Sequence, residues 1–226
     1  MWKKYVFPLL PHEPSARIQY ASWGPVGNHM VYVFRNNIYY VPQMSPNPRP
    51  RVLTQSGVED VIFNGIPDWL YEGEVLKSDQ AIWWSPSGSK LCYGTFNDSE
   101  VEVVQYPFYG SYNDHNNIYP QSVSLRYPKP GRAVPIATLW VVDLTKSDLY
   151  SQQVLPPDEH LDVYFTSVRW IDDDKLAVVW MRRNQNSSCL SFCSVNSNWV
   201  CEKVGPLVYN ESYIFSMRRN ILVFSV

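Results

Sequence analysis

The sequence lacks the motifs that most enzymes need. It contains no Gly-x-Ser-x-Gly nucleophile motif, no phosphate-binding P-loop and no Gly-x-Gly-x-x-Gly dinucleotide motif. Only four histidines occur, and none lies at a metal-ligand spacing: His12, His29, His115 and His160. The residues therefore show no evident nucleophile and base, and we expect neither a metal nor another cofactor.

An excess of one charge and long apolar runs are also missing. The formal net charge is −2 and the basic residues are scattered, which argues against a nucleic-acid partner. No run approaches the roughly 18 apolar residues of a membrane span. Residues 1–10 hold a short apolar run, but a proline interrupts it and no small-residue cleavage site follows. We therefore expect no targeting segment within these 226 residues.

Aromatic residues and turn formers are abundant by contrast. Aromatics make up 15% of the chain, and 18 prolines outnumber 10 glycines, which favours an all-β protein. A unit of strand, polar turn and strand recurs in residues 20–33, 81–93 and 167–180. Such repeats predict a β-propeller, and a single sandwich with similar hairpins is the alternative.

Two stretches depart from this repeat. In its third copy the proline and glycine of the turn are replaced by acids, which we interpret as a solvated turn: Asp172, Asp173 and Asp174. Residues 106–135 resemble a long insertion, where prolines exclude a regular helix and confine any strand to a sheet edge. Residues 136–144 after it are predicted to form a buried strand.

The four cysteines do not form a Cys-x-x-Cys pair, so a zinc or thioredoxin-like site has no support. Cys193 and Cys201 flank a polar turn, as the two halves of a hairpin disulfide would. Two unpaired core thiols are the alternative. Three N-glycosylation sequons begin at Asn97, Asn186 and Asn210. Together with a hairpin disulfide they favour an oxidising, secretory environment for the protein.

The stretch from residue 64 to residue 75 interrupts the strand pattern. A turn signal, Asn64-Gly65, and a large aromatic, Trp69, precede Glu72 and Glu74, which lie two residues apart. Two carboxylates on a rigid loop suit a cationic group such as a free amine. The alternative is a short surface helix whose first turn carries acids because the helix dipole favours them there.

Several motifs are more specific than the repeat: Asn64-Gly65-Ile66-Pro67-Asp68-Trp69-Leu70-Tyr71-Glu72, Trp83-Trp84-Ser85-Pro86-Ser87-Gly88, Phe96-Asn97-Asp98, Tyr127-Pro128-Lys129-Pro130-Gly131, Trp180-Met181-Arg182-Arg183-Asn184-Gln185-Asn186-Ser187-Ser188 and the Cys193/Cys201 hairpin. Together these motifs resemble the dipeptidyl peptidase IV family, which includes fibroblast activation protein and catalytically silent relatives that accompany potassium channels. The resemblance implies part of an eight-bladed propeller of four-stranded antiparallel blades, without the α/β-hydrolase domain that carries the family's catalytic Ser, Asp and His.

The expected organisation follows from this resemblance and from where the pattern begins and ends. An irregular lead-in covers residues 1–19, the partial propeller covers residues 20–203, and a divergent tail covers residues 204–226. The resemblance also implies glycans on Asn97 and Asn186. Cys92 and Cys189 fall where relatives have other residues, so we expect both to be unpaired and buried.

The resemblance implies a role for the acids. In the family, acids after the Asp-Trp-x-Tyr run lie on a short helical insertion and bind the free α-amino group of the substrate. The usual run is Tyr-Glu-Glu-Glu, and its last two acids form the binding pair. Here Glu74 matches the last acid and Gly73 replaces its partner, which predicts weaker amine binding by a few kcal/mol. Glu72 is the candidate substitute, helped by the flexibility of Gly73.

Two functions follow from the resemblance. The first is the propeller portion of a serine-type dipeptidyl peptidase, extracellular or anchored at the cell surface, that releases N-terminal dipeptides. Its expected partners are peptides with a free N-terminus, an α/β-hydrolase domain and a second copy in a homodimer. The second is the propeller of a catalytically silent binding or channel-modulating subunit. A standalone β-protein is a third alternative, but a partial propeller has open strand edges that invite aggregation. We therefore expect a piece of a longer protein.

Overall fold

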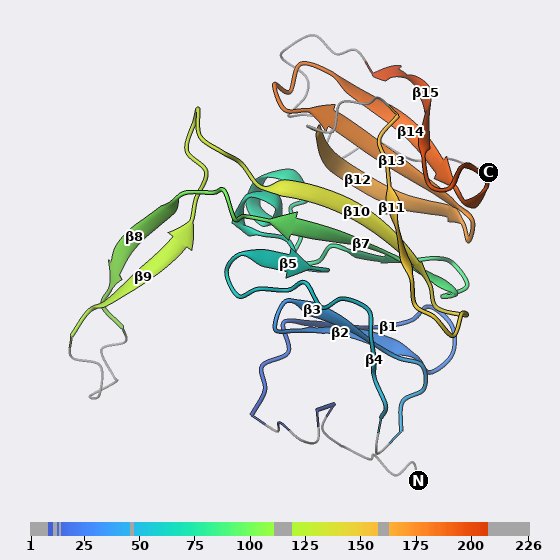
Figure 1. Ribbon diagram of the computed structural model, residues 1–226, viewed down its shortest axis with the longest axis horizontal. Coiled ribbons are helices and arrows are strands. Elements are labelled where there is room, and N and C mark those ends of the chain that lie inside the picture. Colours follow the sequence, from blue (N-terminus) through green and yellow to red (C-terminus); the bar gives the residue numbers. More distant parts are fainter. Residues whose placement is uncertain are drawn as a thin grey trace. The chain divides into compact units, whose positions relative to one another are not determined.

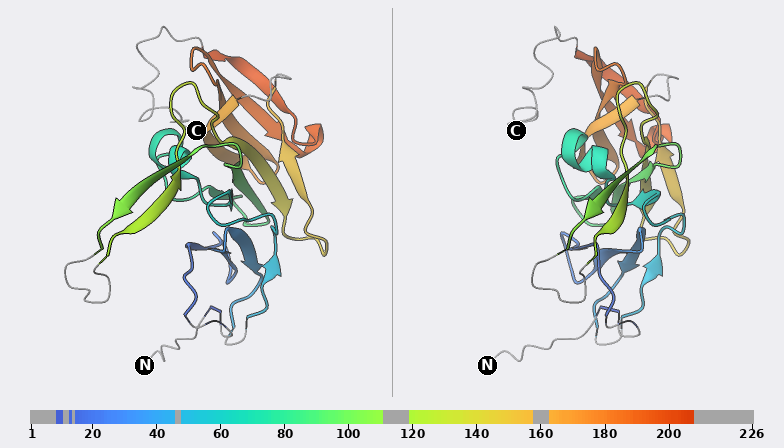
Figure 2. Two further views of the ribbon diagram at one scale, coloured as in Figure 1. Left: turned by 60° about the vertical axis from the view of Figure 1, so that its left-hand side comes forward. Right: turned by 90° about the vertical axis from the view of Figure 1, so that its left-hand side faces the viewer.

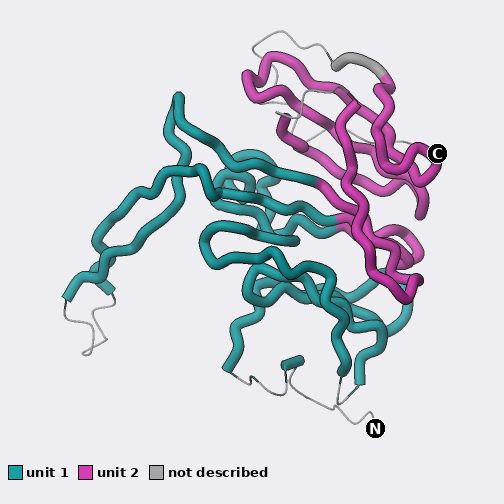
Figure 3. The backbone as a smooth tube through the Cα atoms, in the orientation of Figure 1, with its two compact units in different colours: residues 1–82, 93–138 teal, residues 83–92, 139–226 magenta. Residues whose placement is uncertain are grey.

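β-strands make up nearly all of the regular structure of this chain (Figure 1). The computed structural model describes residues 9–10, 13, 15–45, 48–110, 119–157 and 163–207. Two compact units divide the chain: residues 1–82 with 93–138, and residues 83–92 with 139–226 (Figure 3). Within the described ranges, no helix has the length and apolar character needed to cross a membrane.

The first sheet is a four-stranded antiparallel meander in the first unit, as the earliest repeat predicts. The turn between its first two strands holds Gly27 at a φ of +84°, a conformation that glycine adopts without strain. Described residues of the lead-in form no strand but pack against the core of this sheet: Leu9, Leu10 and Ile18. The strands lie in the order β1 (Tyr20–Trp23), β2 (Met30–Phe34), β3 (Asn37–Val41) and β4 (Arg51–Val52).

The second repeat also forms strand, turn and strand, with Gly88 at a φ of +75° in the turn. The strand predicted over residues 136–144 is confirmed as β10. The resulting sheet has the order β11-β10-β7-β5, and β6 also pairs with β7. Its strands are β5 (Ile62–Asn64), β6 (Ile82–Trp84), β7 (Lys90–Asn97), β10 (Ile136–Asp143) and β11 (Ser151–Val154).

The third repeat begins a second four-stranded antiparallel meander, in the second unit. Its inner strand β13 is buried continuously from Leu176 to Trp180, because neighbouring strands cover both of its edges. The strands lie in the order β12 (Val163–Asp172), β13 (Lys175–Arg182), β14 (Ser188–Ser194) and β15 (Cys201–Leu207). Strand β15 therefore runs four residues past the boundary expected at residue 203, and the tail beyond residue 207 lies outside the described residues.

The acidic turn between β12 and β13 is more than a solvated connection. Asp173 accepts a hydrogen bond from the backbone N of Ser87 at 2.9 Å, and this bond is the main cause that lowers the pKa of the Asp173 carboxyl. Asp174 forms an ion pair with Lys90 at 2.8 Å. Asp173 is half-buried and Asp174 is exposed to solvent, and together they join the turns of the second and third repeats within the second unit.

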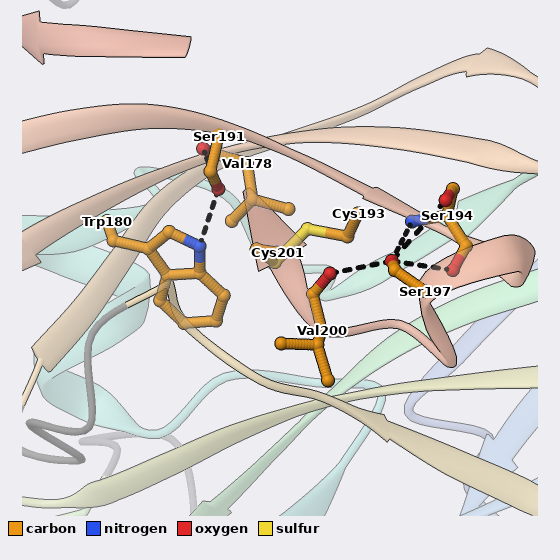
Figure 4. The surroundings of a disulfide bond; sticks show 8 residues. All are labelled: Val178, Trp180, Ser191, Cys193, Ser194, Ser197, Val200 and Cys201. Atoms are coloured by element: carbon orange, nitrogen blue, oxygen red, sulfur yellow. Dashed lines mark hydrogen bonds between the residues drawn. A yellow bond between two sulfur atoms is a disulfide. The ribbon is translucent and has the colours of Figure 1, made fainter. Parts of the chain in front are cut away.

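Cys193 and Cys201 form a disulfide between directly opposite positions of β14 and β15 (Figure 4). The polar turn between them is a short 3₁₀ helix, η2 (Val195–Ser197), followed by the buried Trp199. A cross-link that closes so short a loop stabilises a fold by roughly 2–3 kcal/mol, because it restricts the unfolded chain.

The insertion contains a two-stranded ribbon of β8 (Val103–Phe108) and β9 (Gln121–Arg126) in the first unit (Figure 2). Pro107 lies within β8. Both strands of a two-stranded sheet are edge strands, so this proline lies on an edge strand, as the sequence predicts. Residues 111–118 between the two strands lie outside the described part.

Candidate amine-binding site

A loop of the first unit carries the acids, and its base is tied to the sheet. Gly65 N donates to the carbonyl of Gly94 at 2.9 Å, and Ala81 N donates to the carbonyl of Gly65, also at 2.9 Å. Gly65 has a φ of +75°, and a Cβ there would lie 2.7 Å from the side chain of Ile82. Only glycine therefore fits this entry to the loop.

Asp68 starts the helical part of this loop. Its Oδ2 accepts from the backbone N of Leu70 at 2.9 Å, its Oδ1 makes a longer contact of 3.4 Å with Tyr71 N, and its carbonyl accepts from Glu72 N at 2.9 Å. This is the arrangement of an N-cap, in which a carboxylate satisfies the first free amides of a helix. Asp68 is only 2% exposed, so its charge is held below the surface.

Two aromatic contacts anchor the helix that follows, η1 (Tyr71–Val75). Tyr71 is fully buried, and its ring lies 4.7 Å from that of Phe96 on β7. Trp69 packs on Tyr127, just after β9, with ring centroids 4.5 Å apart. The helix closes with a hydrogen bond of 2.8 Å from Leu76 N to the carbonyl of Tyr71, which spans five residues as in a π-helix.

The predicted acids Glu72 and Glu74 both lie on η1 and are exposed to solvent. Residues two apart on a helix do not face each other, so the intact helix does not aim both carboxylates at one ammonium group. Position 73 precedes Glu74 directly and lies about 100° from it around the helix axis, so a side chain there would be closer in direction to Glu74 than Glu72 is. A Cβ added to Gly73 would meet no atom within 4 Å. The helix therefore has space for a side chain next to Glu74, but glycine leaves it empty.

The first unit contains a second buried carboxyl group, that of Asp98. The sequence patterns did not identify Asp98 as a candidate site residue. It is 3% exposed, and its Oδ1 has no hydrogen-bond partner among the described residues. Burial and the nearby Asp68 charge raise the pKa of Asp98 to about 7, against the opposing effect of Arg126. In the sequence, Asp98 stood within the sequon at Asn97 and within the Phe96-Asn97-Asp98 motif of the resemblance, and neither signal indicates burial.

The remaining candidates are distributed elsewhere. His29 forms a 3.1 Å hydrogen bond with Tyr40 Oη, and burial lowers its pKa, whereas His12, His115 and His160 lie outside the described residues. Cys92 is buried as expected, but Cys189 is only half-buried, because its strand position leaves part of it accessible. In the described ranges, no group of three or more His, Cys, Asp or Glu could hold a metal.

The sequons differ in their surroundings. Asn97 is half-buried at the end of β7, and its Oδ1 accepts from Ser99 N at 2.9 Å, which fixes the turn of the sequon. Asn186 is exposed in the connection between β13 and β14. Asn210 lies outside the described residues. Glycosylation at all three stays a prediction.

The chain matches proteins of known type along most of its length. A family model described as the dipeptidyl peptidase IV N-terminal region matches residues 3–220. Prolyl endopeptidase FAP of Homo sapiens is 38% identical over 185 residues, which are 80% of this chain and 23% of that protein. Dipeptidyl peptidase 4 of Sus scrofa is 37% identical over 191 residues, which are 80% of this chain and 24% of that protein. Inactive dipeptidyl peptidase 10 of Mus musculus is 40% identical over 186 residues, which are 81% of this chain and 22% of that protein.

A solved structure shares the fold. The crystal structure of Porphyromonas gingivalis dipeptidyl peptidase 4 superposes with a TM-score of 0.72 and 22% identity, and the match covers 86% of this chain and 26% of that one. With the four-stranded antiparallel sheets, this confirms a partial β-propeller in place of a single sandwich. The chain spans about a quarter of the length of these relatives.

Proposed function

We propose, because this chain belongs to the dipeptidyl peptidase IV family, that it is the propeller portion of a serine-type dipeptidyl peptidase and recognises the free N-terminus of peptide substrates. The observation that carries this proposal is the acid-bearing helix η1, which Asp68 caps and Tyr71 anchors to the sheet. A helix held in this way fixes the backbone that carries the acids, which reduces the conformational freedom lost when one of them binds an ammonium group. Release of dipeptides would further require an α/β-hydrolase domain as a partner.

Glu74 is the principal amine-binding residue in this proposal. Glu72 lies on another side of η1 and contributes only if the helix partly unwinds, for which Gly73 supplies the flexibility. Because both acids are exposed, an ion pair with either one alone stabilises a complex by only about 0.2–1 kcal/mol. The 226-residue chain should therefore bind short peptides weakly.

A second function is favoured by one observation. Glycine stands at position 73, where the family usually carries the second acid of the amine-binding pair. A propeller without this acid is suited to a catalytically silent protein that uses the propeller for binding. One of the relatives is named inactive. The two functions differ in whether the chain distinguishes a free amine from a blocked one.

Removing single acids tests the first function. We expect Glu74→Ala to lower the affinity of the chain for a short peptide with proline second by up to about fivefold, the equivalent of about 1 kcal/mol, and Glu72→Ala to have a smaller effect. The shifts of peptide signals in an NMR titration measure the affinity. In a protein that also carries the hydrolase domain, Glu74→Ala should abolish dipeptide release and Glu72→Ala should weaken it.

The matched control is Glu59→Ala, which removes an exposed acid of the same unit and should leave affinity unchanged. The same peptide with an acetylated N-terminus should bind more weakly by at least the factor expected for Glu74→Ala. Equal binding of free and acetylated peptides, or equal affinities in all three variants, would contradict amine recognition and favour the silent function.

We also propose that the chain forms a homodimer through the ribbon of β8 and β9. A lone two-stranded ribbon is only marginally stable in water, and within the described residues β8 pairs with β9 alone. Large apolar side chains of β8 are half-exposed, which suits an interface with a second copy: Val103, Tyr106 and Phe108.

A charged substitution on the ribbon tests this dimer. Phe108→Asp should shift the molecular mass in sedimentation from dimer to monomer at equal concentration, because a buried carboxylate would face an apolar partner surface. Tyr150→Asp, on an exposed residue of the other unit, should leave the mass unchanged. A monomeric unmodified chain, or a dimer that survives Phe108→Asp, would refute the ribbon interface.

The proposed location is the cell surface or the extracellular space. The disulfide between Cys193 and Cys201 supports an oxidising compartment, and Asn186 is accessible to glycosylation.

A further inference from the structure

Asp98 is a buried acid whose backbone is held by hydrogen bonds on both sides. Its backbone N donates to the carbonyl of Val61 at 2.8 Å, and its carbonyl accepts from Val101 N at 2.9 Å. The backbone is thus fixed on both sides of the residue, which is only 3% exposed. An ionised carboxylate there lacks both water and a hydrogen bond to Oδ1, so the charged form is disfavoured.

The charged groups around Asp98 are few. Asp68 at the start of the helical loop repels its charge, and Arg126 on β9 attracts it. Arg126 is occupied elsewhere, however, because its Nη1 donates to the carbonyl of Val101 at 2.7 Å and to that of Ser99 at 3.3 Å. The other acids on the adjoining turns are exposed to solvent: Glu59, Asp60, Glu100 and Glu102. Asp68 is therefore the group that responds most directly to the charge of Asp98.

The helix that Asp68 caps has little stability of its own. The π-helix η1 is only five residues long, contains Gly73 on its exposed side, and is followed by Lys77 at a φ of +53°. Short helices of this kind depend on their caps and packing contacts. Any weakening of the Asp68 cap is thus transmitted to the segment that carries Glu74.

We propose that Asp68 and Asp98 act as a proton-sensitive support that positions the helix η1, so that ionisation of Asp98 loosens the cap and frees the acid-bearing segment. With Asp98 neutral, Asp68 keeps both of its oxygens directed at the amides of the first turn. With Asp98 ionised, two buried carboxylates repel each other, which disfavours the position of the Asp68 carboxylate at these amides. The consequence for amine binding rests on the proposed function, whereas the response of the helix to pH does not.

The direction of the pH dependence follows from the raised pKa. A carboxyl whose pKa is higher in the folded chain than in the unfolded chain supports the fold fully below its ordinary range and loses this contribution as pH rises toward about 7. Within the folded chain the helix responds to the ionisation of Asp98 itself, which is centred on this value, so the helix should be firm in mildly acidic solution and looser above neutral pH.

Hydrogen exchange of the capped amides tests the proposal directly. The protection factors of the Leu70, Tyr71 and Glu72 amides in the 226-residue chain, each referred to an unstructured peptide at the same pH, should fall about tenfold between about pH 5.5 and about pH 8.5, the factor that corresponds to one pKa unit of interaction. In Asp98→Asn the protection factors should not change with pH. Glu100→Gln, which removes an exposed charge two residues away, should behave as the unmodified chain does.

A second measurement covers the case in which Asp98→Asn does not fold. The carboxyl carbon signal of Asp98 in the unmodified chain should titrate near neutral pH, and the protection of the three amides should follow the same midpoint. Protection that is independent of pH, or that varies equally in Asp98→Asn, would overturn the proposal. Neither readout involves the binding of a substrate peptide, so a failure of amine recognition would leave this test unaffected.

Discussion

Replacing Gly73 with glutamate is expected to raise the affinity of the chain for peptides with a free N-terminus by about tenfold or more. The new carboxylate would stand beside Glu74 on the surface of η1, and two acids around one ammonium group bind it better than one. The backbone accepts the change, since a Cβ at position 73 meets no atom within 4 Å and Gly73 has no positive φ. A tenfold gain corresponds to about 1.4 kcal/mol.

The control for this prediction separates charge from helix stability. Any residue other than glycine stabilises a helix interior by up to about 1 kcal/mol, which by itself would hold Glu74 more firmly. Gly73→Gln introduces a side chain of the same size as Gly73→Glu and removes the same backbone entropy cost of glycine, but it carries no charge. Peptide titrations of both variants, with the acetylated peptide as the blank, therefore isolate the second carboxylate. If Gly73→Gln raised the affinity as much as Gly73→Glu, the paired-acid explanation would fail.

Truncating Phe96 to alanine is expected to lower the free energy of unfolding by about 3–5 kcal/mol, a large part of the stability of a typical domain. Phe96 is fully buried on β7, and its ring supports the fully buried Tyr71. Removing it leaves a cavity beneath the residue that anchors η1. The helix should therefore loosen at lower denaturant concentration than the sheets.

Phe108→Ala provides the matched control, because it makes the same substitution at a side chain that is 52% exposed. Urea unfolding of both variants, at concentrations low enough to keep the chain monomeric, compares the two free energies. Phe108→Ala should change the free energy by no more than about 0.5 kcal/mol, the usual range for surface positions. Equal losses at the two positions would show that Phe96 does not support the core as described.

The strands and turns of this chain were predictable because their signals are local. Alternating apolar residues, the Trp-containing repeats and glycines such as Gly27 and Gly88 specify strand, turn and strand within about a dozen residues. The third copy was recognisable even without its Pro-Gly turn, and the pairing of Cys193 with Cys201 was one of the two alternatives that its spacing allowed.

The environment of the candidate site was not predictable in the same way. The sequence placed Glu72 and Glu74 on a short insertion, but only the helix shows that they point to different sides. The link from Asp173 to Ser87 joins residues 86 positions apart, and it turned a predicted solvated turn into a structural contact. No local pattern distinguishes such an acid from an ordinary surface one.

The sequence by itself determined that this chain is built of antiparallel strand repeats and which family it belongs to, since both depend on residue types at short, regular spacings. The tertiary structure alone decided that Asp68 and Asp98, 30 positions apart in the sequence, are buried in one unit and sense each other's charge. The physical reason is that burial and electrostatic repulsion depend on distances through space, which the chain acquires only when its sheets have formed.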